Sequence, residues 1–517
     1  MRSVSSTWGS SERYIPNLLV EENRFSSQPE ERMSECVMNN DYPATRLPLY
    51  HKAIDWDTLF RDYPVPDVFA ETVYQWPTGR LRDVQNERFV KLVEDGWRNP
   101  FYRRRWEAAG LQPGDVRDLG DITRLPTFNS DDIKDNQRDY PPFGDIQGVS
   151  MADLATTPLK LQTSGGTTGK PRPTLFGPME WEMNALTSAR GLYIQGARPG
   201  DVVQIPSTPS LANLGWAYYK AAHDYLGMLP LTTGSGVVTP SRRQIEIAFD
   251  WHTTIWTCFP EYLTQLAKVC RDEFNRDVRE LGTKFISTFL GPDVEGTLRK
   301  KLEDLWGCPV YDQYGTHEIG LGAFECQEKD GLHLMEDCAY FEMVDIETGE
   351  PLPPGQIGNL VVTMLYRRIP PIIRFNVRDL GRIIAEGRCA CGGTFRRMDH
   401  FLGRSDDMVK IRGVNIYPMA CLPAIQSDAR ATGEWICIAD RMEVQGVIRD
   451  EMTVLVETRS DAGDLGGLVD HLERRLYNDL GLKVKVELVG EGGLAEAANL
   501  GREGKPKRLL DRRYARS

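Results

Sequence analysis

The sequence predicts an α/β protein with a large N-terminal α/β domain and a small C-terminal α+β domain. Between about residues 150 and 390, short apolar runs typical of strands, such as DVVQIPS, GNLVVTML and IIRF, alternate with helical segments. This alternation is the pattern of an α/β architecture, in which ligands bind at strand ends. Residues 403–517 follow a different pattern, and 517 residues are enough for more than one domain.

The residues before this region predict an extension followed by helices. Residues 1–45 are polar and weakly periodic, so we expect a flexible N-terminal extension there. From Asp55 to Gly110, the stretches RFVKLVEDGW and PFYRRRWEAAG place apolar residues at helical intervals. The large domain is therefore expected to span residues 46–402 and to begin with helices.

One helix and the strand after it are marked clearly. In GTLRKKLEDLWG, Leu298, Leu302 and Leu305 share one face of a helix. Gly307 is a typical residue for the helix end. The following CPVYDQYG is expected to form a short strand that runs into a loop.

The C-terminal region, residues 403–517, predicts two strands around a helix. MTVLVE is expected to be a strand, and LVDHLERRLYNDLG a helix with Leu468, Leu472 and Leu476 aligned on one face. KVKVELV alternates charged and apolar side chains, as expected for a strand with one buried face.

Composition narrows the class of protein. The net charge is −12 and there is no long run of lysine or arginine, which argues against a nucleic-acid partner. The ten cysteines are scattered, which favours a reducing compartment over a disulfide framework. The N-terminus lacks the apolar core of a signal peptide, and no segment reaches the ~18 apolar residues of a membrane span. We expect a soluble, cytoplasmic protein.

The most unusual stretch is LQTSGGTTGKPRPTLF, residues 161–176. A Walker phosphate loop needs four residues between its glycines and a helix directly after it. Here only three residues separate Gly165 from Gly169, and Pro171 replaces the metal-binding hydroxyl. Because Pro173 also opposes a helix, we expect a strand after the loop. The sequence therefore disfavours a Walker-type ATPase.

The composition of this loop favours binding of an anion. Thr163, Ser164, Thr167 and Thr168 offer four hydroxyls beside unhindered glycine amides, and Lys170 adds a positive charge. A glycine-rich hairpin without a ligand is the alternative. A loop of this kind between two strands is suited to closing over a polyphosphate.

TSGGTTGKP resembles the phosphate loop of the adenylate-forming superfamily, which includes acyl-CoA synthetases and nonribosomal adenylation domains. Four further motifs of that superfamily follow in order: YGTHE (314–318), RFNVRDLG (374–381), GRSDDMVKIRGVNIYP (403–418) and GREGKPKRLLDRR (501–513). Two further segments are most similar to the phenylacetate–CoA ligase family: NPFYRRRWEAAGLQPGDVRDLGDITRLPTFNSDDIKDN, which precedes the loop, and CACGG, which lies just before GRSDDMVKIRGVNIYP. The resemblance runs from about residue 50 to the end.

The resemblance implies a two-step reaction. A carboxylate attacks the α-phosphate of ATP and releases pyrophosphate, and the acyl-adenylate then forms a thioester with coenzyme A and releases AMP. The first step needs no general base, because a carboxylate is already ionised at neutral pH. It needs charge neutralisation and alignment at phosphorus. The resemblance implies that magnesium takes part in this.

The resemblance also assigns roles to residues of the nucleotide site. Glu318 is expected to hold magnesium, Tyr314 to stack on adenine beside Gly315, and Asp379 and Arg404 to bind near the ribose hydroxyls. The grip on the β- and γ-phosphates is assigned to Thr163, Ser164, Gly165, Gly166, Thr167, Thr168, Gly169 and Lys170. Taken singly, Tyr314 could be a core residue, Glu318 a solvated acid and Asp379 a turn residue.

The last two motifs imply a mobile C-terminal domain. Lys505 is expected to bridge the substrate carboxylate and the α-phosphate, with Lys507 or a solvated basic tail as alternatives. One small domain cannot serve both half-reactions in one position, so a rotation about a hinge at Asp406 is expected. The alternative is a loop aspartate paired with Arg404. His317, Val377 and Arg378 depart from the superfamily pattern.

A second group of residues has the composition of a metal site. The two thiols of Cys389 and Cys391, with Cys326 and His333, would form a closed, structural tetrahedral zinc site. Cys338 is a spare ligand, and four ordinary thiols with a turn histidine are the alternative. The phenylacetate–CoA ligase family often has cysteines in these two places.

The substrate is the least determined feature. Trp216, Tyr218 and Phe259 are candidates for a flat aromatic pocket, although an aromatic stripe at helical spacing is more often core. An arylacetic or benzoic-type acid is implied by the resemblance, as is a homodimer. The rival functions are an adenylating enzyme that passes its acyl group to an amine or a carrier-protein thiol, and a non-catalytic binding protein.

Overall fold

The computed structural model of the chain describes residues 46–164, 171–291, 293, 296–406, 408–412, 414–444, 447–498 and 507–513. The predicted N-terminal extension, residues 1–45, lies outside the described residues. Within the described ranges, no helix combines the length and the apolar character that a membrane-spanning segment requires.

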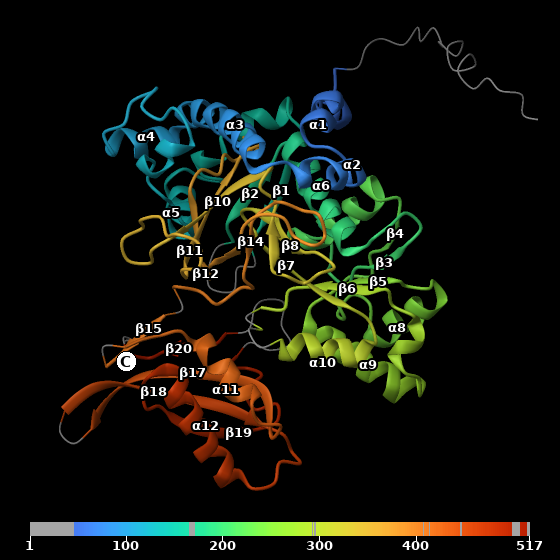
Figure 1. The fold of residues 1–517 in the computed structure, drawn as a ribbon, viewed down its shortest axis with the longest axis vertical. Coiled ribbons are helices and arrows are strands. Elements are labelled where there is room, and N and C mark those ends of the chain that lie inside the picture. Colours follow the sequence, from blue (N-terminus) through green and yellow to red (C-terminus); the bar gives the residue numbers. More distant parts are fainter. Residues whose placement is uncertain are drawn as a thin grey trace, which may run out of the picture. The chain divides into compact units, whose positions relative to one another are not determined.

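The N-terminal part is helical, as the apolar spacing predicts. Its helices are α1 (Trp56–Asp62), α2 (Pro66–Glu71), α3 (Thr78–Arg98), α4 (Pro100–Ala108) and α5 (Ser130–Asp139). Asn99 ends α3 and caps α4, since its side-chain oxygen accepts a hydrogen bond from the backbone N–H of Phe101. Helices α3 and α4 pack side by side (Figure 1), with the rings of Trp97 and Trp106 5.1 Å apart.

A nine-stranded sheet forms the centre of the fold, in the order β13-β14-β9-β8-β7-β6-β5-β3-β4. Strands β3 (Val202–Gln204), β4 (Leu229–Leu231), β5 (Ile255–Thr257), β6 (Phe285–Thr288) and β7 (Val310–Thr316) pair in parallel. Strands β8 (Gly320–Glu325), β9 (Leu332–Leu334), β14 (Arg397–Met398) and β13 (Ile383–Ala385) continue it antiparallel. The parallel half places several strand ends at one edge, where α/β proteins bind ligands.

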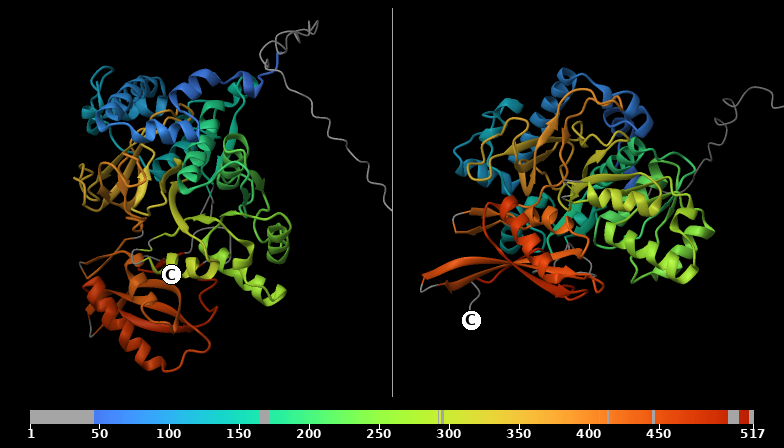
Figure 2. Two further views of the ribbon diagram at one scale, coloured as in Figure 1. Left: turned by 45° about the vertical axis from the view of Figure 1, so that its right-hand side comes forward. Right: turned by 60° about the horizontal axis from the view of Figure 1, so that its bottom comes forward.

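Alternating residues of the parallel strands face two helical layers. Trp256 and Ile286 pack with helices α8 (Ser241–Asp250), α9 (Pro260–Phe274) and α10 (Thr297–Trp306). These helices lie together beside the parallel strands (Figure 1 and Figure 2). Their neighbours Ile255 and Phe285 belong to the other core, with α6 (Pro178–Gln195) and α7 (Leu214–Lys220). Both sides of these strands are therefore buried, as is usual for parallel sheets.

Two local expectations for this region are confirmed. Helix α10 ends at Gly307, whose φ is 68°, and Leu302 on its predicted face is fully buried.

Helix α6 approaches β8 closely because Gly191 has no side chain: a Cβ there would lie 2.2 Å from the ring of Phe324.

A separate three-stranded antiparallel sheet is formed by β10 (Ala339–Val344), β11 (Gly358–Met364) and β12 (Phe375–Gly381). The prediction of a strand over IIRF is wrong for its first three residues, because β12 begins only at Phe375. Arg374 has a φ of 56°, which interrupts the extended backbone just before Phe375, and its guanidinium pairs with the buried Glu342 at 3.0 Å.

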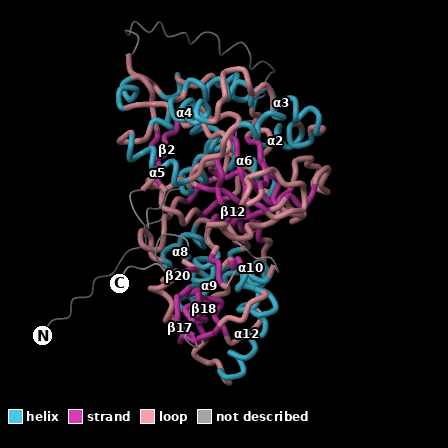
Figure 3. Tube along the Cα trace, turned by 90° about the vertical axis from the view of Figure 1, so that its left-hand side faces the viewer, coloured by secondary structure: helices cyan, strands magenta, loops and turns pink. Residues whose placement is uncertain are grey.

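The C-terminal part has a core of its own. A four-stranded sheet, ordered β19-β18-β17-β20, contains β17 (Ala431–Val444), β18 (Val447–Thr458), β19 (Lys485–Gly490) and β20 (Leu509–Asp511) (Figure 3). The other elements are β15 (Val409–Ile411), β16 (Val414–Ile416), α11 (Leu422–Gln426) and α12 (Leu465–Leu480). Leu468, Leu472 and Leu476 are fully buried, as predicted. The domain boundary at residues 402 and 403 stays a prediction.

Candidate active site

The loop predicted to bind phosphate joins two paired strands. β1 (Lys160–Thr163) and β2 (Pro173–Phe176) are antiparallel, with Thr163 opposite Pro173. The base of the loop is closed by two contacts: Ser164 N donates to the carbonyl of Arg172 at 3.1 Å, and Arg172 N donates to Ser164 Oγ at 3.2 Å. A strand after the loop is therefore confirmed. Gly165, Gly166, Thr167, Thr168, Gly169 and Lys170 lie outside the described residues.

The end of β7 brings the YGTHE motif to the base of this loop. The guanidinium of Arg172 donates to Oε1 of Glu318 from Nη2 at 2.6 Å and from Nε at 3.1 Å. Thr174 Oγ1 lies 2.9 Å from Nε2 of His317. Arg172 is not among the site residues that the sequence predicts, although its place directly after the loop is a signal for one.

The turn that carries Glu318 requires a glycine at its start. Gly315 lies opposite Leu321 where β7 meets β8, and a Cβ at Gly315 would lie 2.3 Å from the carbonyl oxygen of Gly320. Close approach of two backbones thus explains Gly315 in the motif. It sets the position from which Glu318 reaches the loop.

Three of the predicted nucleotide-site residues meet at one buried carboxylate. Asp379 on β12 is 2% exposed. Its Oδ2 accepts from the hydroxyl of Tyr314 at 2.7 Å, and its Oδ1 accepts from Nη1 of Arg404 at 2.7 Å. Tyr314 is buried and its hydroxyl is bonded to Asp379, so it is neither a core residue without a polar partner nor a ring that is free to move.

The predicted hinge residue is paired with the same arginine. Asp406 accepts from Nε and Nη2 of Arg404 at 2.8 and 2.9 Å. Arg378, which departs from the superfamily pattern, reaches Asp131 at 2.7 Å and Asp406 at 3.7 Å. The ion pair expected of an ordinary loop aspartate is thus present, and a hinge role for Asp406 stays a prediction.

Burial and charge shift the titration of this site. Burial raises the pKa of Tyr314 well above its ordinary value, and the charge of Asp379 raises it further. Burial alone would raise the pKa of Glu318, but the guanidinium of Arg172 outweighs it and holds that pKa below its ordinary value. Burial lowers the pKa of His317 from 6.5 to about 4. Glu318 is therefore a carboxylate beside a neutral imidazole.

A fully buried arginine also contacts the motif. Nη1 of Arg367 donates to the backbone carbonyl of Glu318, and its guanidinium lies 4.5 Å from the ring centroid of Phe176. Its Nε and Nη2 atoms have no hydrogen-bond partner among the described residues. Burial lowers the pKa of Arg367, yet the side chain adds a second positive charge next to Glu318.

The structure brings the four predicted zinc ligands together. The ligand atoms of Cys326, His333, Cys389 and Cys391 all lie within 4.8 Å of one another. Sγ of Cys326 is 3.9 Å from Sγ of Cys389, and Sγ of Cys391 is 3.6 Å from Nε2 of His333. These separations fit a tetrahedral site, whose edges are about 3.8 Å for zinc–sulfur bonds of about 2.3 Å.

Two neighbours of this thiol cluster suit a thiolate. The hydroxyl of Tyr74 lies 3.3 Å from Sγ of Cys391, and Gly393 N donates to the same sulfur at 3.4 Å. The spare ligand, Cys338, lies elsewhere: Nη1 of Arg190 donates to its sulfur at 3.6 Å. Cys326 is therefore the thiol that completes the group.

The three candidate substrate residues have different surroundings. Tyr218 is buried, and its hydroxyl accepts from the side-chain amide of Gln313. Trp216 lies 5.0 Å from Nζ of Lys160, measured from the ring centroid. Phe259 is 47% exposed and stacks on Phe289 with centroids 5.6 Å apart. A role of these residues in substrate binding stays a prediction.

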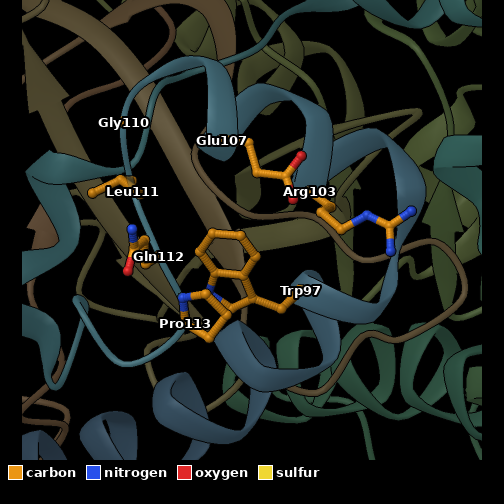
Figure 4. Close-up of a pocket in the computed structure, with 7 residues that line it drawn as sticks. All are labelled: Trp97, Arg103, Glu107, Gly110, Leu111, Gln112 and Pro113. Atoms are coloured by element: carbon orange, nitrogen blue, oxygen red, sulfur yellow. The ribbon is translucent and has the colours of Figure 1, made fainter.

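A surface pocket lies beside helices α3 and α4 and contains none of the predicted site residues. Figure 4 shows its lining, which consists of Trp97, Arg103, Glu107, Gly110, Leu111, Gln112 and Pro113. The predicted catalytic Lys505 lies outside the described residues. Its rival Lys507 is described, and its backbone N donates to the carbonyl of Ala498 at 2.8 Å.

Acid is expected to destabilise the fold through His317. The unfolded chain takes up a proton here near pH 6.5, whereas the folded protein resists it until about pH 4. The unfolded state binds more protons within this window, so stability falls as the pH falls, by roughly 3 kcal/mol in all. Urea unfolding at several pH values should show this loss in the wild type and a smaller one in His317→Gln. Parallel profiles would contradict the assignment.

Comparison with known proteins places the chain in a family. Residues 413–513 match the AMP-binding enzyme C-terminal domain. A phenylacetate–coenzyme A ligase of Thermus thermophilus is 32% identical over 463 residues, covering 84% of this chain and 98% of its own length. That of Escherichia coli is 28% identical over 448 residues, covering 84% of this chain and 95% of its own length.

Solved structures agree with this placement. A 2-hydroxyisobutyryl-CoA ligase in the postadenylation state, in complex with R3-HIB-AMP, is 27% identical with a TM-score of 0.74, covering 85% of this chain and 91% of its own. The same ligase with 2-HIB-AMP and CoA in the thioesterification state has a TM-score of 0.61. The chain therefore belongs to the phenylacetate–CoA ligase family, whose members are adenylate-forming acid–thiol ligases.

Proposed function

We propose that this protein adenylates an aromatic carboxylic acid with ATP and transfers the acyl group to coenzyme A, releasing AMP and pyrophosphate. The observation that carries the proposal is the junction at Glu318. There the end of β7 contacts the base of the hydroxyl-rich loop through Glu318, and it contacts Asp379 through Tyr314. Asp379 is in turn hydrogen-bonded to Arg404. Relatives named as phenylacetate–coenzyme A ligases in several species support the acid and the acceptor.

The described residues suit the nucleotide end of this reaction. The carboxylate of Asp379, which Tyr314 and Arg404 hold in place, is the acceptor that the ribose hydroxyls would use. Thr163 and Ser164 would begin the grip on the β- and γ-phosphates. The buried, ionised Glu318 is a suitable oxygen ligand for magnesium. Magnesium, when bound, would neutralise phosphate charge.

The acid and its acceptor need the other predicted residues. Lys505 would bridge the carboxylate and the α-phosphate, which brings two anions together while charge builds up at phosphorus. Rotation about Asp406 would then remove Lys505 and admit the thiol of coenzyme A. Transfer to an amine or a carrier-protein thiol is the alternative, because the adenylation step is the same.

A panel of carboxylic acids tests the proposal. With ATP, magnesium and coenzyme A, arylacetic and benzoic-type acids are expected to yield CoA thioesters that mass spectrometry detects. Exchange of labelled pyrophosphate into ATP with an acid, but without thioester, would favour the amine or carrier-protein alternative. Absence of exchange with every acid would favour a binding protein without catalysis.

The role of Lys505 can be separated from that of its neighbour. Lys505→Ala is expected to slow adenylation by about a hundredfold or more, because a charge aimed at the developing transition state is lost. Thioester formation from a supplied acyl-adenylate should be largely retained. Lys507→Ala, the matched control, should retain both half-reactions. Equal loss of both half-reactions in Lys505→Ala would contradict the assignment.

We further propose that Cys326, His333, Cys389 and Cys391 hold a structural zinc ion in a reducing cytoplasm. All nine cysteines within the described ranges are free thiols. Elemental analysis should find about one zinc per chain. Cys389→Ser is expected to lose zinc and lower the melting temperature, whereas Cys338→Ser, a buried thiol outside the cluster, should retain zinc. Protein that folds fully without zinc would contradict the proposal.

A further inference from the structure

The carboxylate expected to hold magnesium is already occupied by a cation of the protein. Oε1 of Glu318 accepts two hydrogen bonds from Arg172, from Nη2 at 2.6 Å and from Nε at 3.1 Å. The Glu318 side chain is only 7% exposed and that of Arg172 20%. Oε2 lies 3.3 Å from the hydroxyl of Thr316, so both oxygens have a described donor.

The charges around Glu318 oppose binding of a metal ion alone. Arg172 pairs with the carboxylate of Glu318, and Arg367 brings a second positive charge to the backbone carbonyl of the same residue. A divalent ion on this carboxylate would meet the guanidinium of Arg172 directly, and that of Arg367 at the backbone of the same residue. At an effective dielectric constant of about 20, each repulsion of this kind costs several kcal/mol. The polyphosphate of ATP supplies the negative charge that removes this cost.

We propose that Arg172 is a positioning residue that takes the metal's place on Glu318 while no nucleotide is bound, so that the divalent cation binds only together with ATP. The inference rests on the proposed role of Glu318 as magnesium ligand. When the nucleotide enters, the guanidinium exchanges the carboxylate for a phosphate oxygen. Each buried charge thus keeps a partner before and after binding.

The backbone of Arg172 favours this exchange. Its N–H and carbonyl are both bonded to Ser164 at the base of the phosphate-binding loop. The side chain can therefore move while its root stays beside Thr163 and Ser164, the described residues expected to contact phosphate. Guanidinium groups bind carboxylate and phosphate with the same planar geometry, so both partners suit the same side chain.

A permanent structural ion pair is the alternative, and the chain contains a matched example. Arg396 pairs with the buried Glu336 at 2.6 Å, with side chains 26% and 4% exposed. This pair has the same residue types, a similar burial and no predicted site residue. Substituting both arginines in parallel separates loss of an ion pair from gain of a metal site.

The test measures binding of Mn²⁺ to the protein without nucleotide, by the electron paramagnetic resonance signal of free Mn²⁺. Arg172→Gln is expected to bind one Mn²⁺ about tenfold or more tightly than the wild type, because one repulsive charge is removed and Glu318 is freed. Arg396→Gln should match the wild type. The double variant Arg172→Gln/Glu318→Gln should lose the gain, which excludes the thiol cluster as its source.

The wild type provides a second measurement that needs no variant to fold. It should bind Mn²⁺ weakly alone and tightly with a non-hydrolysable ATP analogue. An Arg172→Gln affinity within about twofold of the wild type, a gain that survives Glu318→Gln, or tight nucleotide-free binding by the wild type would overturn the inference. An active ligase with any of these results keeps the proposed function. A Mn²⁺ gain in a protein that forms no thioester would sustain the inference alone.

Discussion

The predicted nucleotide site depends on the buried carboxylate of Asp379. A charge that is 2% exposed is tolerated only when it is paired and hydrogen-bonded, and here Tyr314 and Arg404 are among the donors. These donors come from the end of β7 and from the segment after β14. One polar requirement therefore fixes three stretches of chain at a single position, and the turn through Gly315 carries Glu318 from there to the loop base.

The site is locally positive in a protein that is acidic overall. The net charge of the chain is −12, yet Arg172, Arg367 and Arg404 surround two buried acids. A local excess of guanidinium groups prepares a site for a polyphosphate, whereas the global charge says little about it. If Arg172 has the proposed role, nucleotide and metal are coupled electrostatically, since each supplies the charge that the other needs at Glu318.

The thiol cluster has a different physical role from the nucleotide site. It joins the turn after β8 to the loop that precedes β14, and Tyr74 links it to the N-terminal helices. A loop with two neighbouring glycines has little core to hold it, so ligands to the proposed zinc ion would restrain it. The cluster lies on the same antiparallel half of the sheet that carries the YGTHE turn.

Local chemistry was readable from the sequence because it depends on neighbours in the chain. Pro171 and Pro173 forbid a helix, so a strand had to follow the loop, and the leucines of α10 and α12 gave their buried faces. The strand predicted over IIRF was wrong for its first three residues, because apolar residues do not reveal φ. Arg374 has a positive φ and pairs with a buried acid far from it in the sequence.

Only the tertiary structure decided which distant side chains meet. Arg172 and Glu318 are 146 positions apart, and Tyr314 and Asp379 are 65 apart. No pattern within either segment encodes such a pairing, because it follows from how the sheet, the hairpin and β12 pack. The sequence alone determined the order of the motifs and their chemical types. The fold determined that the expected metal ligand is held by an arginine, since a buried carboxylate must have a partner.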